Sequence, residues 1–205
     1  MNRSIAQFLA VVLTAAWVAS PYAAPLSDEE ELDLAYGDRS FITIASGSRQ
    51  PIARAPSVAT VITAEDIAAI GAVDLDEVLE TVPGLHVSRS SLGYNPIYVI
   101  RGIHSQYNPQ VLMLVNGIPI TSVIVGDRSQ IWGGMPVEHI ARIEVIRGPG
   151  SALYGADAFS GVINIITRTA ADLNGTQLGA RAGSFHSRDA WAQHGGTWGG
   201  FDVAA

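Results

Sequence analysis

The glycine-rich segment at residues 148–155 (GPGSALYG) is the stretch closest to a motif with its own chemistry. Glycine-rich loops bind phosphate through backbone N–H groups, and a phosphate-binding P-loop ends in Gly-Lys-Ser/Thr. That ending is absent here, and Pro149 removes one N–H donor. The glycine spacing also differs from the GxGxxG of dinucleotide-binding loops. We therefore expect no nucleotide site in this segment.

The side chains that usually carry acid–base, nucleophilic or metal chemistry are scattered along the chain. No two histidines have the three- or four-residue spacing of a helical metal site, since they stand at His86, His104, His139, His186 and His194. No serine lies in a GxSxG elbow, and the absence of cysteine excludes thiol nucleophiles, thiolate zinc sites and disulfides. We expect no catalytic residue, no metal and no cofactor; a secreted hydrolase remains only a third alternative.

The overall composition is that of a folded chain with little charge. Of 205 residues, 48% are apolar and 15% are charged, which excludes a disordered, charge-rich tail. The net charge is −7 and every basic side chain is an arginine, so a nucleic-acid partner is not expected. The length suits one domain, or one domain and part of another.

The first residues have the pattern of an export signal. Arg3 precedes an uncharged apolar stretch at residues 5–19 that is too short to span a membrane and is interrupted by Ser20 and Pro21. We predict a signal peptide over residues 1–24. An acidic run follows (DEEELD, 28–33), which is typical of a solvated, mobile segment. Residues 40–45 then form a short β-prone stretch that could add a strand to the sheet edge of another protein or of its own domain.

Residues 57–168 have the pattern of a mixed α+β domain. We predict strands over 57–63, 96–103, 110–115, 140–146 and 162–167, a tight hairpin turn at Asn116-Gly117, and an edge strand containing Pro119. A capping box begins a short helix at residue 63, and Asp74 begins a second. In the second helix the apolar positions should face the core, while Asp76, Glu77 and Glu80 should face water.

Residues 176–183 alternate in a different way. Leu178, Ala180 and Ala182 should point outward and Gln177, Gly179 and Arg181 inward, which is the weak signature of a strand in a membrane barrel. Residues 189–194 and 201–205 supply further strand candidates. Because open sheet edges cannot face lipid, two or three such strands would be an incomplete barrel.

Several motifs in order resemble the plug domain of TonB-dependent outer-membrane receptors. They are IRG (100–102), VLMLVNGIPI (111–120), IARIEVIRGPGSALYG (140–155) and ADAFSGVINIIT (156–167). The resemblance covers about residues 41–169 and implies an α+β plug domain with a small mixed β-sheet, short helices and long loops, followed by the first strands of an antiparallel transmembrane β-barrel. It implies a signal peptide (1–24), a flexible acidic N-terminus (25–50), a plug domain (51–169) and the start of the barrel (170–205).

The resemblance also implies a function without enzymatic activity. Such receptors sit in the outer membrane and take up scarce ligands of the siderophore, haem or cobalamin class through a barrel closed by the plug, with energy supplied through TonB. TonB grips a short N-terminal segment, the TonB box, by strand addition. The matching residues here are Phe41, Ile42, Thr43, Ile44 and Ala45, and the acidic lead-in should keep them reachable.

The resemblance assigns roles to further residues. Arg101 and Arg147 match plug arginines that pair with glutamates of the barrel wall, a task that suits the planar guanidinium. Ligand contacts are implied in loops near residues 90–108 and 121–134, where the candidates are Tyr94, Asn95, Gln106, Tyr107, Asn108 and Trp132. A stand-alone periplasmic plug-like binding module and a non-functional truncated receptor remain alternatives.

Overall fold

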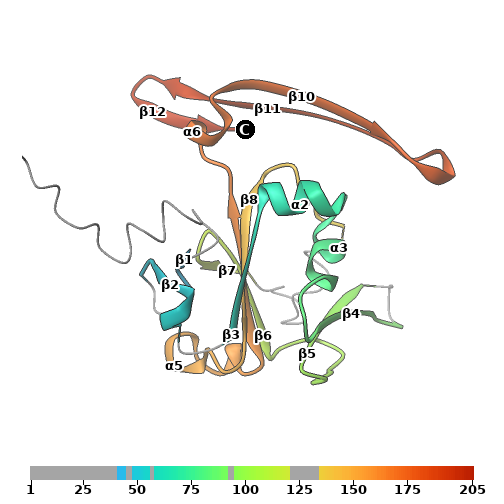
Figure 1. The fold of residues 1–205 in the computed structure, drawn as a ribbon, viewed down its shortest axis with the longest axis vertical. Coiled ribbons are helices and arrows are strands. Elements are labelled where there is room, and N and C mark those ends of the chain that lie inside the picture. The colour runs from blue at the N-terminus through green and yellow to red at the C-terminus, as the bar shows by residue number, and fades with distance from the viewer. Residues whose placement is uncertain (1–40, 45–47, 56–57, 92–94, 121–133) are drawn as a thin grey trace, which may run out of the picture.

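A mixed sheet forms the centre of the molecule in the computed structural model, which describes residues 41–44, 48–55, 58–91, 95–120 and 134–205. The order of its strands is β3-β8-β9-β6-β7. Their bounds are β3 Val58–Thr63, β6 Val111–Val115, β7 Ile118–Pro119, β8 Ile140–Arg147 and β9 Gly161–Thr167. Neighbours are antiparallel except for β6 and β9, which are parallel. Figure 1 shows layers on both sides of this sheet.

One face of the sheet packs against two short helices and a hairpin. These are α2 (Ala64–Ile70), α3 (Leu75–Glu80), and the two-stranded sheet of β4 (Leu85–Arg89) and β5 (Pro96–Ile100). The strands of the central sheet are covered on both faces and supply apolar side chains to each face. The larger of the two resulting cores lies on this face. Its fully buried members include Leu75, Leu79, Tyr98, Ile100, Met113, Ile143 and Ile163.

The other face carries a second, smaller core. It is covered by β1 (Phe41–Ile42), β2 (Gln50–Pro51) and the 3-10 helix η2 (Ile52–Arg54), with α5 (Ser151–Tyr154) and η3 (Ala156–Ala158) nearby (Figure 1). Its buried side chains are Ile42, Ile44, Leu112, Leu114, Ile146, Ala158 and Val162. Gln50, the last residue of the N-terminal segment that was expected to be flexible, thus pairs with Ile42 in this layer.

Helices α2 and α3 begin at the capping residues that the sequence predicted. One residue of α3, Asp76, differs from the expectation. The Thr63–Asp66 capping box begins α2, and the Asp74 side chain accepts from the N–H of Glu77 at the start of α3. The expected apolar face of α3 is buried. Asp76, however, was expected to face water and is only 3% exposed. Its burial is possible because Tyr98 and Arg89 both donate to its carboxylate.

The turns and edges of the sheet follow the predicted pattern. Asn116 and Gly117 both have positive φ, 50° and 79°, as a two-residue hairpin turn requires, and β7 with Pro119 is an edge strand. The strand predicted over 96–103 ends at Ile100, because Arg101 and Gly102 also have positive φ. Gly161 lies so close to β8 that a Cβ there would meet the Ile146 carbonyl oxygen at 2.4 Å.

The last residues form a separate three-stranded antiparallel sheet that extends across one end of the preceding domain (Figure 1). After α6 (Ala170–Leu173) come β10 (Gly175–Ala182), η4 (Ser184–His186), β11 (Arg188–Trp198) and β12 (Phe201–Ala204). Leu178 is exposed and Gly179 and Arg181 are half-buried, as the predicted alternation requires, whereas Gln177, which was expected to point inward, is exposed. Within the described ranges, no helix combines the length and apolar character needed to cross a membrane.

Candidate functional site

Residues 41–44 are docked on the plug. β1 pairs with β2 in antiparallel register, Phe41 opposite Pro51 and Ile42 opposite Gln50. Ile42 and Ile44 insert into the second core and are almost fully buried, and the Arg49 guanidinium lies 3.8 Å from the centre of the Phe41 ring. The expectation that the acidic lead-in keeps these residues reachable therefore does not hold in this conformation. Ala45 lies outside the described residues.

A buried carboxylate binds the backbone of this segment. Glu144 in β8 has no exposed surface, and its Oε2 accepts from the N–H groups of Thr43 (3.0 Å) and Ile44 (3.1 Å). Its Oε1 accepts from Arg142 Nε at 3.1 Å. Consecutive N–H groups of a strand point to opposite edges, so an added strand would need one of these two donors, and both are bound within the chain itself.

A cavity lies beside the docked segment. It has a volume of about 420 Å³ and is lined by Thr43, Ile44, Asn116, Arg142, Tyr154 and Asn164, among others. Burial, together with the nearby charge of Glu144, raises the pKa of the Tyr154 hydroxyl. The segment therefore has a cavity on one side and apolar core on the other.

The two predicted anchoring arginines meet at one turn. Arg147 NH1 donates to the carbonyl of Pro83, and its NH2 donates to Thr60 Oγ1 at 3.2 Å. The backbone N–H of Arg101 donates to the carbonyl of the next residue in that turn, Gly84, at 2.9 Å. Arg101 is exposed, whereas Arg147 is half-buried and its Nε has no hydrogen-bond partner. Two residues 46 positions apart in the chain thus both hydrogen-bond to the 83–84 turn, Arg147 through its side chain and Arg101 through its backbone.

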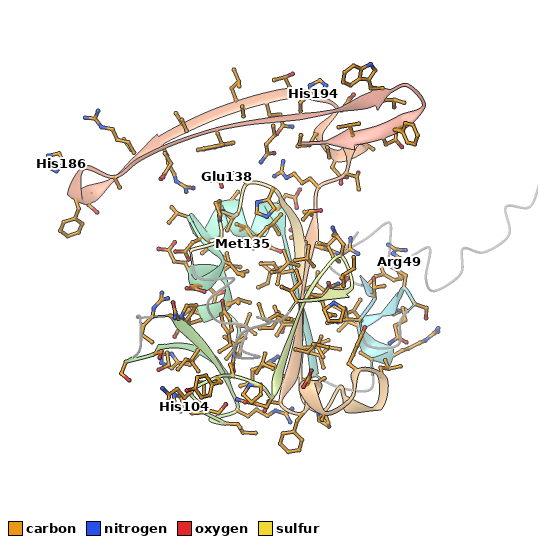
Figure 2. The ribbon with its side chains drawn as sticks, turned by 180° about the vertical axis from the view of Figure 1, so that it is seen from behind. Arg49, His104, Met135, Glu138, His186 and His194 are labelled. Atoms are coloured by element: carbon orange, nitrogen blue, oxygen red, sulfur yellow. The ribbon has the colours of Figure 1, made fainter. Side chains whose placement is uncertain are left out.

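The predicted ligand contacts that the structure describes occupy two segments, and their surroundings differ. Gln106 and Tyr107 are exposed and Asn95 is half-buried, whereas Asn108 is completely buried. Asn108 therefore supports its loop from inside, so it is not part of the outer surface. Tyr94 and Trp132 lie outside the described residues, as do residues 121–133. Figure 2 shows His104, from the 101–110 loop, at the end of the plug opposite β10 and β11.

The comparison with family models gives the decisive observation. Residues 51–162, more than half of the chain, match the model described as the TonB-dependent receptor plug domain. The chain belongs to this family. Its members are receptors, and the predicted fold, a small mixed sheet with short helices, is confirmed by the structure and by its structural neighbours.

Relatives of this plug are considerably longer proteins. The chain is 39% identical over 152 residues to the vitamin B12 transporter BtuB of Vibrio vulnificus (strain CMCP6), an alignment with 74% of this chain and 24% of that protein. It is 41% identical over 137 residues to an iron-regulated outer membrane virulence protein of Vibrio cholerae, covering 64% of this chain and 20% of the relative. The chain thus spans about a quarter or less of the length of these relatives.

Solved structures show the same fold. The pyoverdine outer membrane receptor FpvA of Pseudomonas aeruginosa PAO1 matches with a TM-score of 0.62 and 22% identity, over 78% of this chain and 22% of the receptor. The ferric yersiniabactin uptake receptor FyuA of Yersinia pestis matches with a TM-score of 0.55 and 25% identity, over 69% of this chain and 22% of that one.

An ion pair between the plug and β10 was not predicted. Arg181 NH1 binds Glu138 Oε1 at 2.6 Å, its Nε binds Asp189 at 2.9 Å, and its NH2 donates to the Val73 carbonyl at 3.2 Å. Figure 2 shows Glu138 at the end of the plug that faces this sheet. The alternation of β10 placed Arg181 on the inner face, but no local signal identifies Glu138 as its partner. A cavity of about 500 Å³ separates α2 from β10 and β11 beside this pair.

A buried acidic group in α3 was also missed. Burial raises the pKa of the Asp76 carboxyl, although the hydrogen bonds from Tyr98 and Arg89 partly oppose this shift. Glu80, one turn later, accepts from the Val87 N–H (2.6 Å) and from His86 Nδ1 (2.7 Å), and the bond with His86 lowers its pKa. In the part of the chain that the structure describes, no three His, Cys, Asp or Glu side chains gather as a metal site would require.

Proposed function

We propose that this chain is the plug and gating part of a TonB-dependent outer-membrane receptor for active uptake of a scarce ligand of the siderophore, haem or cobalamin class. The match of residues 51–162 to the plug family carries the proposal. A vitamin B12 transporter and an iron-regulated outer membrane protein among the relatives support this range of ligands. A stand-alone periplasmic plug is the alternative.

The proposal divides the chain into four parts. Residues 1–24 are a signal peptide, 25–50 an acidic N-terminus, 51–169 the plug and 170–205 the first barrel strands. The β10 to β12 sheet supports the last assignment, because it exposes Leu178, Trp198 and Phe201 while Arg181 binds the plug. Arg101 and Arg147, gathered at the 83–84 turn, would hold the plug against glutamates of the barrel wall.

TonB binding by residues 41–45 follows from the same proposal. Strand addition needs the backbone donors of the added segment, and in the docked state those of Thr43 and Ile44 are held by Glu144. TonB would therefore bind only chains whose segment is released. The apparent Kd is then the intrinsic Kd divided by the released fraction, so the apparent affinity is lower.

A proline substitution tests the TonB assignment. Ile44→Pro removes a backbone donor that both Glu144 and an added strand use, so it should undock the segment and still abolish binding to the purified C-terminal domain of TonB. Ile44→Val keeps the N–H group and is the matched control, expected to bind like the wild type. Isothermal titration of the full chain is the measurement. Equal affinity of the proline variant and the wild type would refute the assignment.

A second experiment addresses the location of the protein. The native polypeptide should be detected in the outer-membrane fraction with an antibody against residues 58–91. Its presence only in the soluble periplasm would favour the stand-alone plug.

A further inference from the structure

The β4–β5 hairpin is attached to α3 through a buried polar network. Tyr98, in the middle of β5, has no exposed surface, and its hydroxyl donates to Asp76 Oδ1 at 2.9 Å. The second oxygen of the same carboxylate accepts from Arg89 NH1 at 2.8 Å. Arg89 is the last residue of β4, so one carboxylate binds both strands of the hairpin. The loop at residues 90–95 connects these two strands.

A second loop is attached to the same tyrosine through its backbone. The Asn108 side chain pairs with the main chain of Tyr98: Nδ2 donates to the carbonyl oxygen at 2.8 Å and Oδ1 accepts from the N–H group at 3.2 Å, in the amide orientation that satisfies both. Within this loop Ser105 Oγ donates to Gln110 Oε1 at 2.5 Å. The loop at residues 101–110 is therefore folded on itself and fixed to Tyr98.

Asp76 connects this tyrosine to the rest of the plug. The N–H group of Leu75, its neighbour at the start of α3, donates to the Met135 carbonyl at 2.9 Å, and Leu75 itself is fully buried. The start of α3 is thus held by the rest of the domain, and the Asp76 side chain extends from this helix to β4 and β5. The hairpin belongs to a separate two-stranded sheet, so no strand of the main sheet holds it in register.

A buried carboxylate is a costly way to join two elements. Desolvation of a charge offsets much of what its hydrogen bonds contribute, and apolar side chains of similar volume often stabilise as well or better. A carboxylate that accepts hydrogen bonds from two donors does, however, hold those two donors in a defined orientation. Supporting residues around binding sites act in the same way. Compared with an apolar replacement, Asp76 therefore contributes the orientation of the hairpin more than global stability.

We propose that Asp76 is a positioning residue for the ligand-facing end of the plug: through Tyr98 and Arg89 it fixes the 101–110 loop and the ends of the β4–β5 connection, residues 90, 91 and 95, relative to α3 without touching the ligand. The proposal rests on the proposed function only in taking these two loops as the ligand surface. Its other part, that Asp76 keeps these loops ordered, can be measured by hydrogen exchange on the chain without ligand.

Hydrogen exchange of the full chain in detergent, followed by mass spectrometry, tests this proposal. Tyr98→Phe removes only the hydroxyl, and Asp76→Asn removes the charge with little change in volume. Both should accelerate amide exchange at least tenfold in peptides covering residues 86–91 and 95–108. Exchange in β8 and β9 should stay within twofold of the wild type. Glu77→Gln, on the exposed side of the same helix, is the matched control and should change neither region.

Two results would overturn the proposal. Unchanged exchange in both loops would show that Asp76 does not fix them. Equal acceleration everywhere, with a lower thermal midpoint, would show that it only stabilises the fold. Titration with cyanocobalamin and with a ferric catecholate chelate tests the proposed function separately: if neither binds the wild type while loop exchange still rises in the variants, the ligand assignment fails and the positioning role stands.

Discussion

Removal of the Glu144 carboxylate tests how firmly residues 41–44 are held on the plug. In the wild type this buried side chain accepts two backbone N–H bonds from the segment. Glu144→Ala deletes both bonds and leaves the burial of Ile42 and Ile44 in place. The variant should therefore shift the equilibrium between docked and released segment while the sheet remains folded.

The expected shift follows from the two bonds. A hydrogen bond to a charged group contributes about 1.5–3 kcal/mol, so losing two costs at least about 3 kcal/mol. Each 1.4 kcal/mol is a factor of about ten, so the released fraction should rise about 100-fold. Burial of Ile42, which the labelling variants retain, still contributes about 1.5–3 kcal/mol, so the docked form remains populated. Glu144→Gln keeps one acceptor oxygen and should give an intermediate shift.

Thiol labelling measures the released fraction directly. The chain contains no cysteine, so Ile44→Cys introduces the only thiol, at a position that is 2% exposed when docked. When docking is fast relative to alkylation, the labelling rate is proportional to the released fraction. The rate should be about 100-fold higher in the Glu144→Ala background, and TonB affinity should rise in parallel.

The matched control is Glu65→Ala, which removes a carboxylate from the exposed surface of α2 on the opposite face of the sheet. Its labelling rate should equal that of the parent. If Glu144→Ala labels within twofold of the parent, the carboxylate does not hold the segment, and the reasoning from its two bonds is wrong.

Three further predictions concern the plug itself. Gly161→Ala would place a Cβ 2.4 Å from the Ile146 carbonyl oxygen and 2.6 Å from Ile100 Cδ1, so urea unfolding should show a loss of about 1–3 kcal/mol. Gly196→Ala meets only the His194 side chain at 3.3 Å and should change stability by less than about 0.5 kcal/mol. The pKa of Asp76 is raised, so this group contributes stability that is fully present below its ordinary value of 3.8 and is lost as pH rises through the folded value. The stability of the wild type relative to Asp76→Asn should therefore be greatest at low pH and fall toward neutrality; no change in this difference would contradict the assignment. Arg181→Ala should speed proteolysis between the plug and β10, and adding Glu138→Ala should have almost no further effect because the pair acts as a unit, with a coupling of about 1 kcal/mol. Additive effects would show that the two side chains act independently.

The elements that the sequence predicted well are those specified by neighbouring residues. Thr63 and Asp66 form both halves of a capping box within one helical turn, and Asn116-Gly117 dictates a two-residue turn by conformational preference alone. The strand positions followed from continuous apolar runs, because both faces of the central sheet are covered.

The features that the sequence did not predict depend on distant partners. Glu144 lies 100 residues from Ile44, and a glutamate within a strand gives no local sign of the backbone it binds. Asp76 was expected in water because helical periodicity separates polar from apolar positions, whereas its burial depends on Tyr98, 22 residues later. The roles proposed for Arg101 and Arg147 rest on family resemblance alone, and their shared turn became visible only in the fold.

The strand order of the sheet has a consequence for how this protein is made. β9 is the last of the five strands in the chain, yet it lies in the middle, between β8 and β6. Before residues 161–167 are available, the sheet consists of two unconnected parts, β3 with β8 and β6 with β7. Both parts then expose apolar strand edges, which are prone to pair with other chains. The central sheet therefore cannot be completed progressively from the N-terminus, and a chaperone that covers these edges would protect the chain until β9 closes the sheet.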